Sequence, residues 1–378
     1  MRIERCFETF AWLRAVEDCA AGADLVARTR GERDAVVKRI GSGTVAIGLA
    51  AAGAAAWWLR HVTAPAVRKW QPGCGEIVSA GDLAIRVCGS GDRAFVLLHG
   101  LVASGDVFGA AFDRLTQHGR LIVPDLFGFG RSMRVKSQSF GLEDHLDALD
   151  AMLEALGANA ARLVIGGHSL GGLLALHWAA RRREQVDAVL TWGAPLFRDE
   201  AEARERLQAM GFLEQLFARD SPMAEKSCEW MCRYRGAAAV AAAILSPDLP
   251  IPISRRAVLH TWPAYRGAVG IFFSDWRAAL SRLHDAGVPV TITAGSDDPS
   301  QVAGLAHTLA AEFATIRAFD VEGAAHTLPL RIQTNALRHC CAVPRVDSSC
   351  GTSQRRQAPT WSDIEAIPEC HPNAVAGF

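Results

Sequence analysis

The stretch LVIGGHSLGG, residues 163–172, joins an apolar strand to a helical run, Leu173–Ala180. It contains a G-x-S-x-G motif in the strand–turn–helix context that exposes a nucleophilic serine, here Ser169. In so sharp a turn, side chains at Gly167 and Gly171 would collide with neighbouring backbone. The alternative is a glycine-rich turn that contains a serine by coincidence, and motifs elsewhere in the chain argue against it.

The composition is that of a globular protein with a large core. Half of the 378 residues are hydrophobic, and the formal net charge of zero gives no indication of nucleic-acid binding. The ten cysteines show no paired framework. Cys228 and Cys232 form a single C-x3-C with no second pair, so a zinc site is not expected. No other metal site and no cofactor are expected either.

An uncharged run of 20 residues, 40–59, follows a charged N-terminal segment, residues 1–39. Its length is that of a membrane-spanning helix, and Trp57 and Trp58 at its end suit a membrane interface, so a single-pass anchor is expected. A buried helix of a soluble domain is the alternative. Lys and Arg are more numerous before the run than after it, which favours an extracytoplasmic position for the rest of the chain, with the cytoplasmic face as the alternative. Residues 60–75 are read as a linker.

From residue 76 onward, short apolar strands alternate with helical runs, after an opening antiparallel pair. This pattern predicts an α/β fold with a mostly parallel sheet and helices on both faces. The expected strands are Glu76–Ser79, Leu83–Cys88, Ala94–Leu98, Leu121–Val123, Leu163–Ile165, Ala188–Trp192, Val288–Ala294 and Thr315–Phe319, and the expected helices are Asp106–Gln117, Leu142–Leu156, Leu173–Arg182 and Gln301–Glu312.

Two segments depart from this alternation. Residues 194–286 are helical in pattern and rich in aromatic side chains, and we interpret them as an inserted lid within a domain that spans residues 76–330. Residues 331–378 supply only a weak apolar stripe and then turn to Ser, Gln, Pro, Arg and Cys, as in a disordered tail. The helix expected to cover the last strand is therefore missing.

A serine hydroxyl needs a base to remove its proton and a third group to orient that base. In a sheet of this kind the partners follow the serine as acid and then histidine, each after a strand. Asp297 and Asp298 both follow the strand Val288–Ala294, so the acid is one of these two. His326 follows the strand Thr315–Phe319, and a solvated loop histidine is the alternative reading of this residue.

An oxyanion requires two backbone donors. The sequence places one at Leu170, directly after the serine, and the other at Leu101, in the turn after the third strand. His99 and His168 are expected to have structural roles. Asp125 lies in the wrong strand order for the acid and is expected to hold the turn at residues 128–130 through its backbone amides.

The chain contains five motifs that belong together: His99-Gly100, DLFGFGRS at residues 125–132, GHSLG at 167–171, Gly295-x-x-Asp298 and Gly323-x-x-His326. As a set, they resemble the α/β-hydrolase fold superfamily, over roughly residues 76–330. The resemblance is greatest to its small-molecule esterases, lipases and carbon–carbon bond hydrolases. It implies a triad of Ser169, Asp298 and His326 with an acyl-enzyme intermediate, and it favours Asp298 over Asp297. A serine in the turn argues against the dehalogenase and epoxide-hydrolase branches. The N-terminal anchor resembles that of membrane-bound monoacylglycerol lipases.

The expected function is that of a serine hydrolase acting on a small-molecule carboxylic ester with an apolar, medium-chain acyl group. A carbon–carbon bond hydrolase or a cofactor-free perhydrolase could use the same triad. A membrane-tethered binding protein that has lost turnover is the alternative from another functional class. The oligomeric state is left open.

Overall fold

The computed structural model describes residues 50–133, 139–209 and 222–332, in two compact units, 1–64 and 65–378. Residues 50–63 of the first unit are helical. The first ten residues of the expected membrane helix, 40–59, lie outside the described residues, as do the segment 1–39 and all but the first two residues of the expected tail. Within the part of the chain that is described, no helix combines the length and the apolarity of a membrane span.

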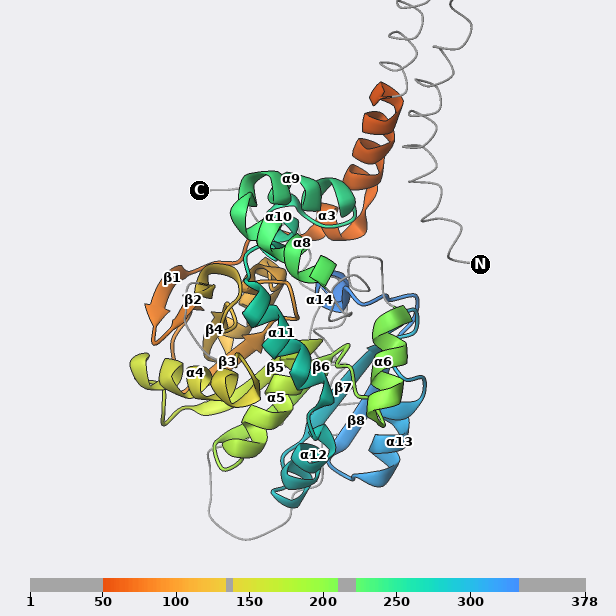
Figure 1. The fold of residues 1–378 in the computed structure, drawn as a ribbon. Helices are drawn as coiled ribbons and strands as arrows, with labels where there is room; N and C mark the ends of the chain where they lie inside the picture. The colour runs from red at the N-terminus through yellow and green to blue at the C-terminus, as the bar shows by residue number, and fades with distance from the viewer. Residues whose placement is uncertain (1–49, 134–138, 210–221, 333–378) are drawn as a thin grey trace, which may run out of the picture. The chain divides into compact units, whose positions relative to one another are not determined.

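The second unit is built on one eight-stranded sheet (Figure 1). Its order is β1-β2-β4-β3-β5-β6-β7-β8, and every pairing from β4 to β8 is parallel. The hairpin β1–β2 at one edge is antiparallel, as expected. The strands are β1 Glu76–Ala80, β2 Leu83–Cys88, β3 Arg93–Leu98, β4 Arg120–Pro124, β5 Arg162–His168, β6 Val186–Trp192, β7 Val290–Gly295 and β8 Ile316–Val321.

Successive residues of the central strands enter two separate hydrophobic clusters. In β3, Val96 and Leu98 pack into the larger cluster, whereas Phe95 and Leu97 pack into the smaller one. This alternation follows from the two-residue period of a strand, and it explains why the sequence of β3 is apolar throughout. The sheet is thus covered on both faces.

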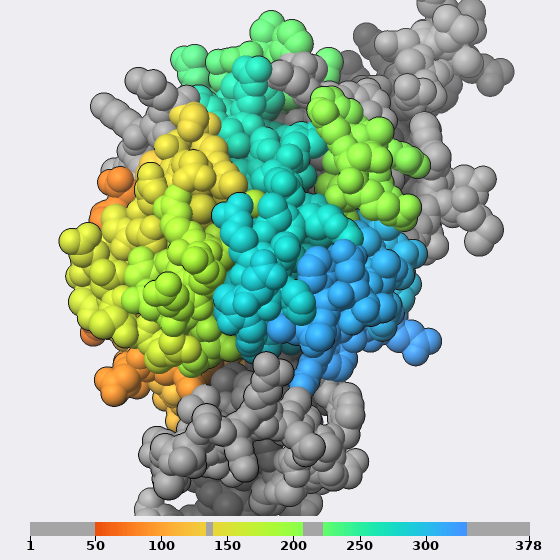
Figure 2. All heavy atoms as spheres, turned by 90° about the horizontal axis from the view of Figure 1, so that it is seen from below, coloured from red at the N-terminus to blue at the C-terminus, as the bar shows by residue number. Residues whose placement is uncertain are grey.

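The two faces carry different amounts of helix. The larger cluster joins the sheet to α4 Leu142–Ala155, α5 Leu170–Arg181, α12 Trp276–Asp285 and α13 Leu305–Glu312. Figure 2 shows this side, with the teal surface of the residues before β7 between the yellow-green surface of α4 and α5 and the blue C-terminal part. The opposite face receives short elements, among them η1 Gly105–Val107, η2 Ala110–Gln117, α10 Ile251–Ala257 and α14 Leu328–Ile332.

The helix expected at Asp106–Gln117 is instead two 3-10 segments, η1 and η2. Ser104 caps η1 by accepting a hydrogen bond from the amide of Asp106, and Gly109 interrupts the run. The amide of Ala110 donates to the carbonyl of Gln71 at 2.9 Å and not to the preceding turn, and a Cβ atom at Gly109 would overlap the same carbonyl oxygen, so the crossing of this segment accounts for the break. Two further short elements are α3 Pro65–Lys69 and η3 Gly130–Ser132.

The described part of the segment expected to form a lid consists of helices joined by short non-helical connections, after a non-helical start at residues 194–199. Its elements are α6 Glu200–Ala209, α8 Pro222–Arg233, α9 Arg235–Leu245, α10, α11 Trp262–Gly270, η4 Ile271–Phe273 and α12. The last of these, α12, packs against the core helix α5 and buries Trp276, Leu280 and Leu283 there.

A disulfide joins Cys74 to Cys88, a pairing that the cysteine spacing in the sequence did not indicate. The β1–β2 hairpin explains the pairing, because Glu76 lies opposite Val87 and the chain on either side of this pair is held together. The bond closes a loop with a sequence separation of 14 residues. Such a cross-link stabilises a protein by about 3 kcal/mol, mainly by restricting the unfolded chain.

Candidate active site

Ser169 lies at the junction of β5 and α5, where the sequence predicts a nucleophilic serine. Its backbone angles are φ 55° and ψ −121°, a strained conformation for a residue with a side chain. A Cβ atom at Gly167 would overlap the carbonyl oxygen of Gly171, and one at Gly171 would overlap that of Leu98. Both glycines are therefore required by the backbone, as the sequence predicts.

The structure brings Ser169, Asp298 and His326 together in a hydrogen-bonded chain. His326 Nε2 lies 2.9 Å from Ser169 Oγ, and His326 Nδ1 lies 2.9 Å from Asp298 Oδ2. The three residues come from the ends of β5, β7 and β8, which all point to the same edge of the parallel sheet. A base that contacts both a hydroxyl and a buried carboxylate is the arrangement that activates a serine.

Of the two candidate acids, only Asp298 faces His326. Asp298 is 5% exposed, whereas the exposed Asp297 accepts a hydrogen bond from its neighbour Ser296. Burial alone would raise the pKa of Asp298, but hydrogen bonds from His326 and Ser300 lower it below its ordinary value. Asp298 is thus held as a carboxylate, the form that orients a histidine.

Gly193, at the end of β6, leaves room for this pair. It has φ +59°, and a Cβ atom there would lie 3.1 Å from Asp298 Oδ2 and 3.6 Å from His326 Nδ1. Gly193 belongs to none of the motifs quoted from the sequence. Its position directly after the strand that follows the serine is the signal that could have indicated it.

A family model described as the α/β hydrolase fold matches residues 93–220 of this chain. In structure the chain is similar to a thermophilic esterase from Thermogutta terrifontis, with a TM-score of 0.51 and 21% identity, covering 71% of this chain and 98% of the esterase. It is also similar to a putative lipase from Acinetobacter baumannii, with a TM-score of 0.53 and 16% identity, covering 75% and 94% of the two chains. The chain has an α/β-hydrolase fold.

In sequence, the chain is 35% identical to the pimeloyl-[acyl-carrier protein] methyl ester esterase of Yersinia enterocolitica over 133 residues. This match covers 34% of the chain and 48% of that esterase. It is also 29% identical to the coelenterazine h 2-monooxygenase of Renilla reniformis over 99 residues, 32% of that protein. The chain thus spans half or less of the length of these curated relatives.

The two amides expected to form an oxyanion hole in this hydrolase fold belong to segments that lie next to Ser169. Leu170 is the first residue of α5, so its amide is one of those that no intrahelical carbonyl accepts. Leu101 follows Gly100, where a Cβ atom would come within 3.1 Å of Ser169 Cβ. The next residue, Val102, has φ 51°, a strained conformation for a β-branched side chain. The turn that carries Leu101 is therefore tightly constrained next to the serine.

His99 and Asp125 brace this turn. His99 is buried, with Nε2 accepting the amide of Leu126 at 2.8 Å and Nδ1 2.7 Å from the carbonyl of Gly100. Asp125 accepts the amides of Gly105 and Arg131, both at 2.7 Å. Both residues thus join backbone segments, as expected of structural residues, although the amides that Asp125 accepts belong to Gly105 and Arg131 and not to residues 128–130.

His168 does more than fill space beside the serine. Its Nε2 lies 2.7 Å from the carbonyl oxygen of His326, across 158 residues of sequence. Burial lowers the pKa of His168 to about 3, so the ring is neutral and donates this hydrogen bond. His168 therefore ties the loop of His326 to the turn of Ser169, a contact that the sequence pattern does not reveal.

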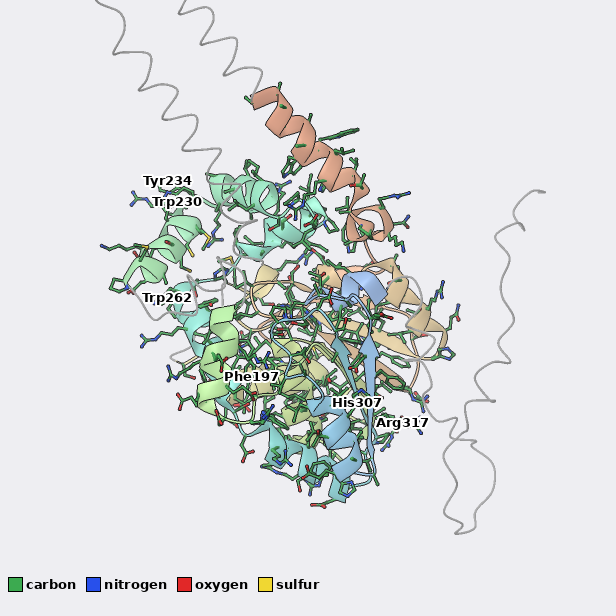
Figure 3. The ribbon with its side chains drawn as sticks, turned by 90° about the vertical axis from the view of Figure 1, so that its right-hand side faces the viewer. Phe197, Trp230, Tyr234, Trp262, His307 and Arg317 are labelled. Atoms are coloured by element: carbon green, nitrogen blue, oxygen red, sulfur yellow. A yellow bond between two sulfur atoms is a disulfide. The ribbon has the colours of Figure 1, made fainter. Side chains whose placement is uncertain are left out.

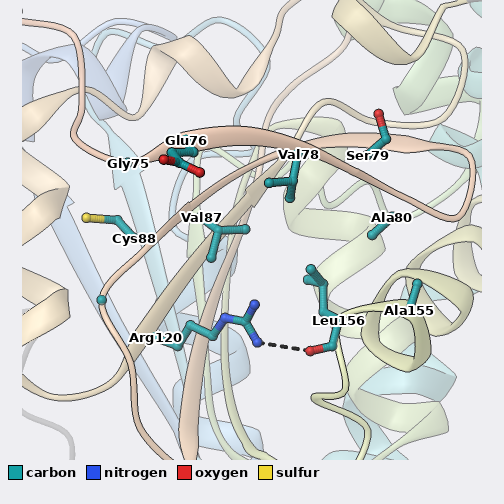
Figure 4. Close-up of a pocket in the computed structure, with 11 residues that line it drawn as sticks. Gly75, Glu76, Val78, Ser79, Ala80, Val87, Cys88, Arg120, Ala155 and Leu156 are labelled. Atoms are coloured by element: carbon teal, nitrogen blue, oxygen red, sulfur yellow. Dashed lines mark hydrogen bonds between the residues drawn. The ribbon is translucent and has the colours of Figure 1, made fainter.

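A cavity of about 470 Å³ among the described residues lies away from the triad. Figure 4 shows it between the β1–β2 hairpin and the end of α4, where Arg120 donates a hydrogen bond to the carbonyl of Leu156. Its lining includes no member of the triad. No cluster of metal-ligating side chains occurs among the residues that the structure describes.

Proposed function

We propose that this chain is a serine hydrolase that cleaves carboxylic esters with apolar, medium-chain acyl groups through an acyl-enzyme intermediate. The single observation that carries the proposal is the continuous hydrogen-bonded chain from Ser169 through His326 to the buried Asp298. A serine that is activated in this way attacks carbonyl carbon.

In the first half of the reaction, Ser169 Oγ attacks the ester carbonyl and His326 Nε2 takes the hydroxyl proton. The Asp298 carboxylate keeps the proton of His326 on Nδ1 and stabilises the imidazolium that forms. The amides of Leu101 and Leu170 stabilise the negative charge on the carbonyl oxygen. His326 then donates its proton to the leaving alkoxide, and the acyl group remains on Ser169.

In the second half, His326 removes a proton from a water molecule, which attacks the acyl group. The tetrahedral intermediate collapses, the acid product leaves, and Ser169 recovers its proton from His326. These steps use only side chains and backbone amides of the protein together with a water molecule.

The ester substrate class is supported by the similarity over 133 residues to a protein that is named as a methyl ester esterase. The preference for a medium-chain acyl group rests on the apolar composition of residues 194–286, which we propose to act as a lid. Because each methylene that is buried contributes roughly 0.8 kcal/mol, a few carbons would raise kcat/KM by one or two orders of magnitude.

The proposal is tested with p-nitrophenyl esters of increasing acyl length and with a fluorophosphonate probe, each on the wild type and on Ser169→Ala. The wild type should hydrolyse esters and be labelled, whereas the variant should do neither and keep its melting temperature. Labelling without ester hydrolysis would favour a carbon–carbon bond hydrolase or a perhydrolase. A folded wild type that is not labelled would favour a binding protein, and a rate that peaks at acetate would contradict the medium-chain preference.

We further propose that residues 40–59 anchor the protein in a membrane, with the hydrolase domain outside the cytoplasm. The anchor rests on the sequence alone. The outside position is supported by the Cys74–Cys88 disulfide, because disulfides persist in oxidising compartments and are rare in the cytosol. The full-length protein should stay in the membrane fraction through alkaline carbonate washing, and deletion of residues 1–70 should release it. A full-length protein that is soluble without detergent would contradict the anchor. Alkylation of Cys74 and Cys88 without prior reduction would contradict the position outside the cytoplasm.

A further inference from the structure

Ser300 lies two residues after Asp298 and is 1% exposed. Its hydroxyl oxygen is 2.7 Å from Asp298 Oδ1 and 3.0 Å from His326 Nδ1, and its backbone amide donates to Asp298 Oδ1 at 2.9 Å. A single hydroxyl therefore contacts both the acid and the base of the triad. The steps proposed above make no use of it.

The direction of these hydrogen bonds follows from the chemistry of the partners. An ionised carboxylate can only accept, so the Ser300 hydroxyl donates its proton to Asp298 Oδ1. Its lone pairs are then available to His326 Nδ1, which must be the protonated nitrogen to donate to them. The Nδ1–H is thus shared between Asp298 Oδ2 and Ser300 Oγ, and Nε2 is left as the acceptor that faces Ser169.

We propose that Ser300 is a positioning residue of the triad, which holds the carboxylate of Asp298 and the ring of His326 in the orientation and tautomer that activate Ser169. This inference rests on the proposed hydrolase function. The three side chains form a closed ring of hydrogen bonds, so rotation of the carboxylate or of the imidazole breaks more than one of them.

The side chain of Gln301 makes a further, longer contact with the Ser300 hydroxyl. The Gln301 side-chain amide lies 3.4 Å from Ser300 Oγ, and it donates to the carbonyl of Ala194 at 3.0 Å. Ala194 follows Gly193, so the side chain of Gln301 links the loop after β7 to the end of β6. The cluster is thus assembled from three strand ends, which a role confined to the local turn would not require.

The test compares Ser300→Ala with wild type on a p-nitrophenyl ester. Alanine keeps the backbone amide that donates to Asp298 and removes only the hydroxyl, so the fold should persist. We expect kcat to fall about 10- to 100-fold with KM within about twofold, because the ring of His326 loses a fixed orientation. The rate of fluorophosphonate labelling should fall by a similar factor, and Ser300→Thr, which restores a hydroxyl, should recover most of both rates.

The matched control is Ser132→Ala. Ser132 is also buried and its hydroxyl also makes two hydrogen bonds, donating to the carbonyl of Asp125 at 2.7 Å and accepting the amide of Ala84 at 2.9 Å. These partners lie outside the triad. Its loss should lower the melting temperature at least as much as the loss of the Ser300 hydroxyl and leave kcat within about twofold of wild type.

A spectroscopic measurement distinguishes an effect of Ser300 on the orientation of His326 from an effect on the stability of the fold. It does not depend on catalytic turnover. The far-downfield proton resonance of His326 Nδ1–H, assigned by its loss in Asp298→Asn, should move in Ser300→Ala and stay unchanged in Ser132→Ala. An unmoved resonance, or a kcat for Ser300→Ala within twofold of wild type, overturns the inference. A wild type that neither cleaves esters nor reacts with the probe overturns the proposed function instead, and the resonance still decides the role of Ser300.

Discussion

Asp297 and Asp298 are chemically identical neighbours, yet only the carboxylate of Asp298 contacts His326. From the residues alone the acid could be either one. The resemblance to the α/β-hydrolase superfamily favours Asp298, and the geometry places that side chain in the interior and Asp297 at the surface. The two side chains have the same chemistry, so their different environments in the folded protein decide which one can orient His326.

Asp298→Asn should therefore lower kcat by about three to four orders of magnitude, because an amide favours the wrong tautomer of the imidazole. Asp297→Asn, the matched control, removes one exposed charge and should change kcat less than about threefold. Steady-state kinetics on a p-nitrophenyl ester measure both effects. Equal losses in the two variants, or a larger loss in Asp297→Asn, would show that Asp298 is not the acid.

At the scale of elements, the junction of β5, Ser169 and α5 depends on backbone contacts that only glycine permits. Gly171→Ala would drive a methyl group into the carbonyl oxygen of Leu98, so a shift of β3 or α5 is unavoidable. We expect a loss of about 2–3 kcal/mol in the free energy of unfolding, with a drop in esterase activity. Urea denaturation measures this loss.

Gly236→Ala is the control for that variant. Gly236 lies in α9, and a Cβ atom there would meet nothing within 4 Å. Because Gly236 lies in the first turn of α9 and not in its interior, this change should stabilise the protein only slightly, by up to about 0.5 kcal/mol, since alanine has the higher helix propensity. If both variants were equally stable, close packing at the turn would not explain the glycine at position 171.

The aromatic residues of the proposed lid differ in where they lie. Phe272 is 6% exposed and packs in the larger hydrophobic cluster, on the segment η4 that contacts α5. Trp230 is 48% exposed on α8, next to Tyr234, and Figure 3 shows both at the outer edge of the molecule. In this structure Phe272 is a core residue and Trp230 a surface residue.

Phe272→Ala should accordingly cost about 3–5 kcal/mol of stability through the cavity it leaves and should not shift the acyl-length profile. Trp230→Ala should lower the melting temperature far less. Thermal melts and the series of p-nitrophenyl esters check the two variants together. A shift of the profile towards other chain lengths in Phe272→Ala would instead place this ring at the acyl group.

At the scale of the whole molecule, the interior holds several histidines in the neutral form. The rings of His145 and His260 each stack on the ring of Phe129, and burial lowers the pKa of each histidine to about 4. Neither ring nitrogen of His145 has a hydrogen-bond partner in the structure, so a proton on it would be unsatisfied. These rings are therefore a source of acid sensitivity.

The direction in which stability changes with pH follows from the numbers of protons that the folded and unfolded states bind. In the unfolded chain these histidines titrate near pH 6.5, so between about pH 6.5 and pH 4 the unfolded state binds more protons than the folded state. Stability is complete above this range and falls as the pH is lowered through it, by roughly 2–3 kcal/mol for a histidine such as His145.

Urea denaturation at a series of pH values from 7.5 to about 4.5 should show this decline. His145→Leu should reduce its slope, because one buried titrating group is removed. His307→Ala is the control, since His307 is an exposed residue paired with Asp320 on the surface. A slope that is the same in wild type and His145→Leu would mean that other groups cause the acid sensitivity.

The amino-acid sequence was sufficient to predict the order of strands and helices and the turn at Ser169. It also predicted the need for Gly167 and Gly171 and the placement of a histidine after the last strand. The reason is that each depends on local pattern: the two-residue period of strands, a glycine-rich turn, and the order of motifs along a parallel sheet. Element boundaries shift by a few residues, and the expected helix at 106–117 became 3-10 segments because a distant backbone crosses at Gly109.

Tertiary structure alone decided which contacts the side chains make. The hydrogen bond from His168 to the loop of His326 spans 158 residues, and that between Ser300 and His326 spans 26. The Cys74–Cys88 disulfide and the burial of Phe272 likewise depend on segments that meet only after folding. A sequence pattern reports the backbone preferences of neighbours along the chain, whereas a hydrogen bond of 3 Å requires the positions that the packed sheet gives to its strand ends.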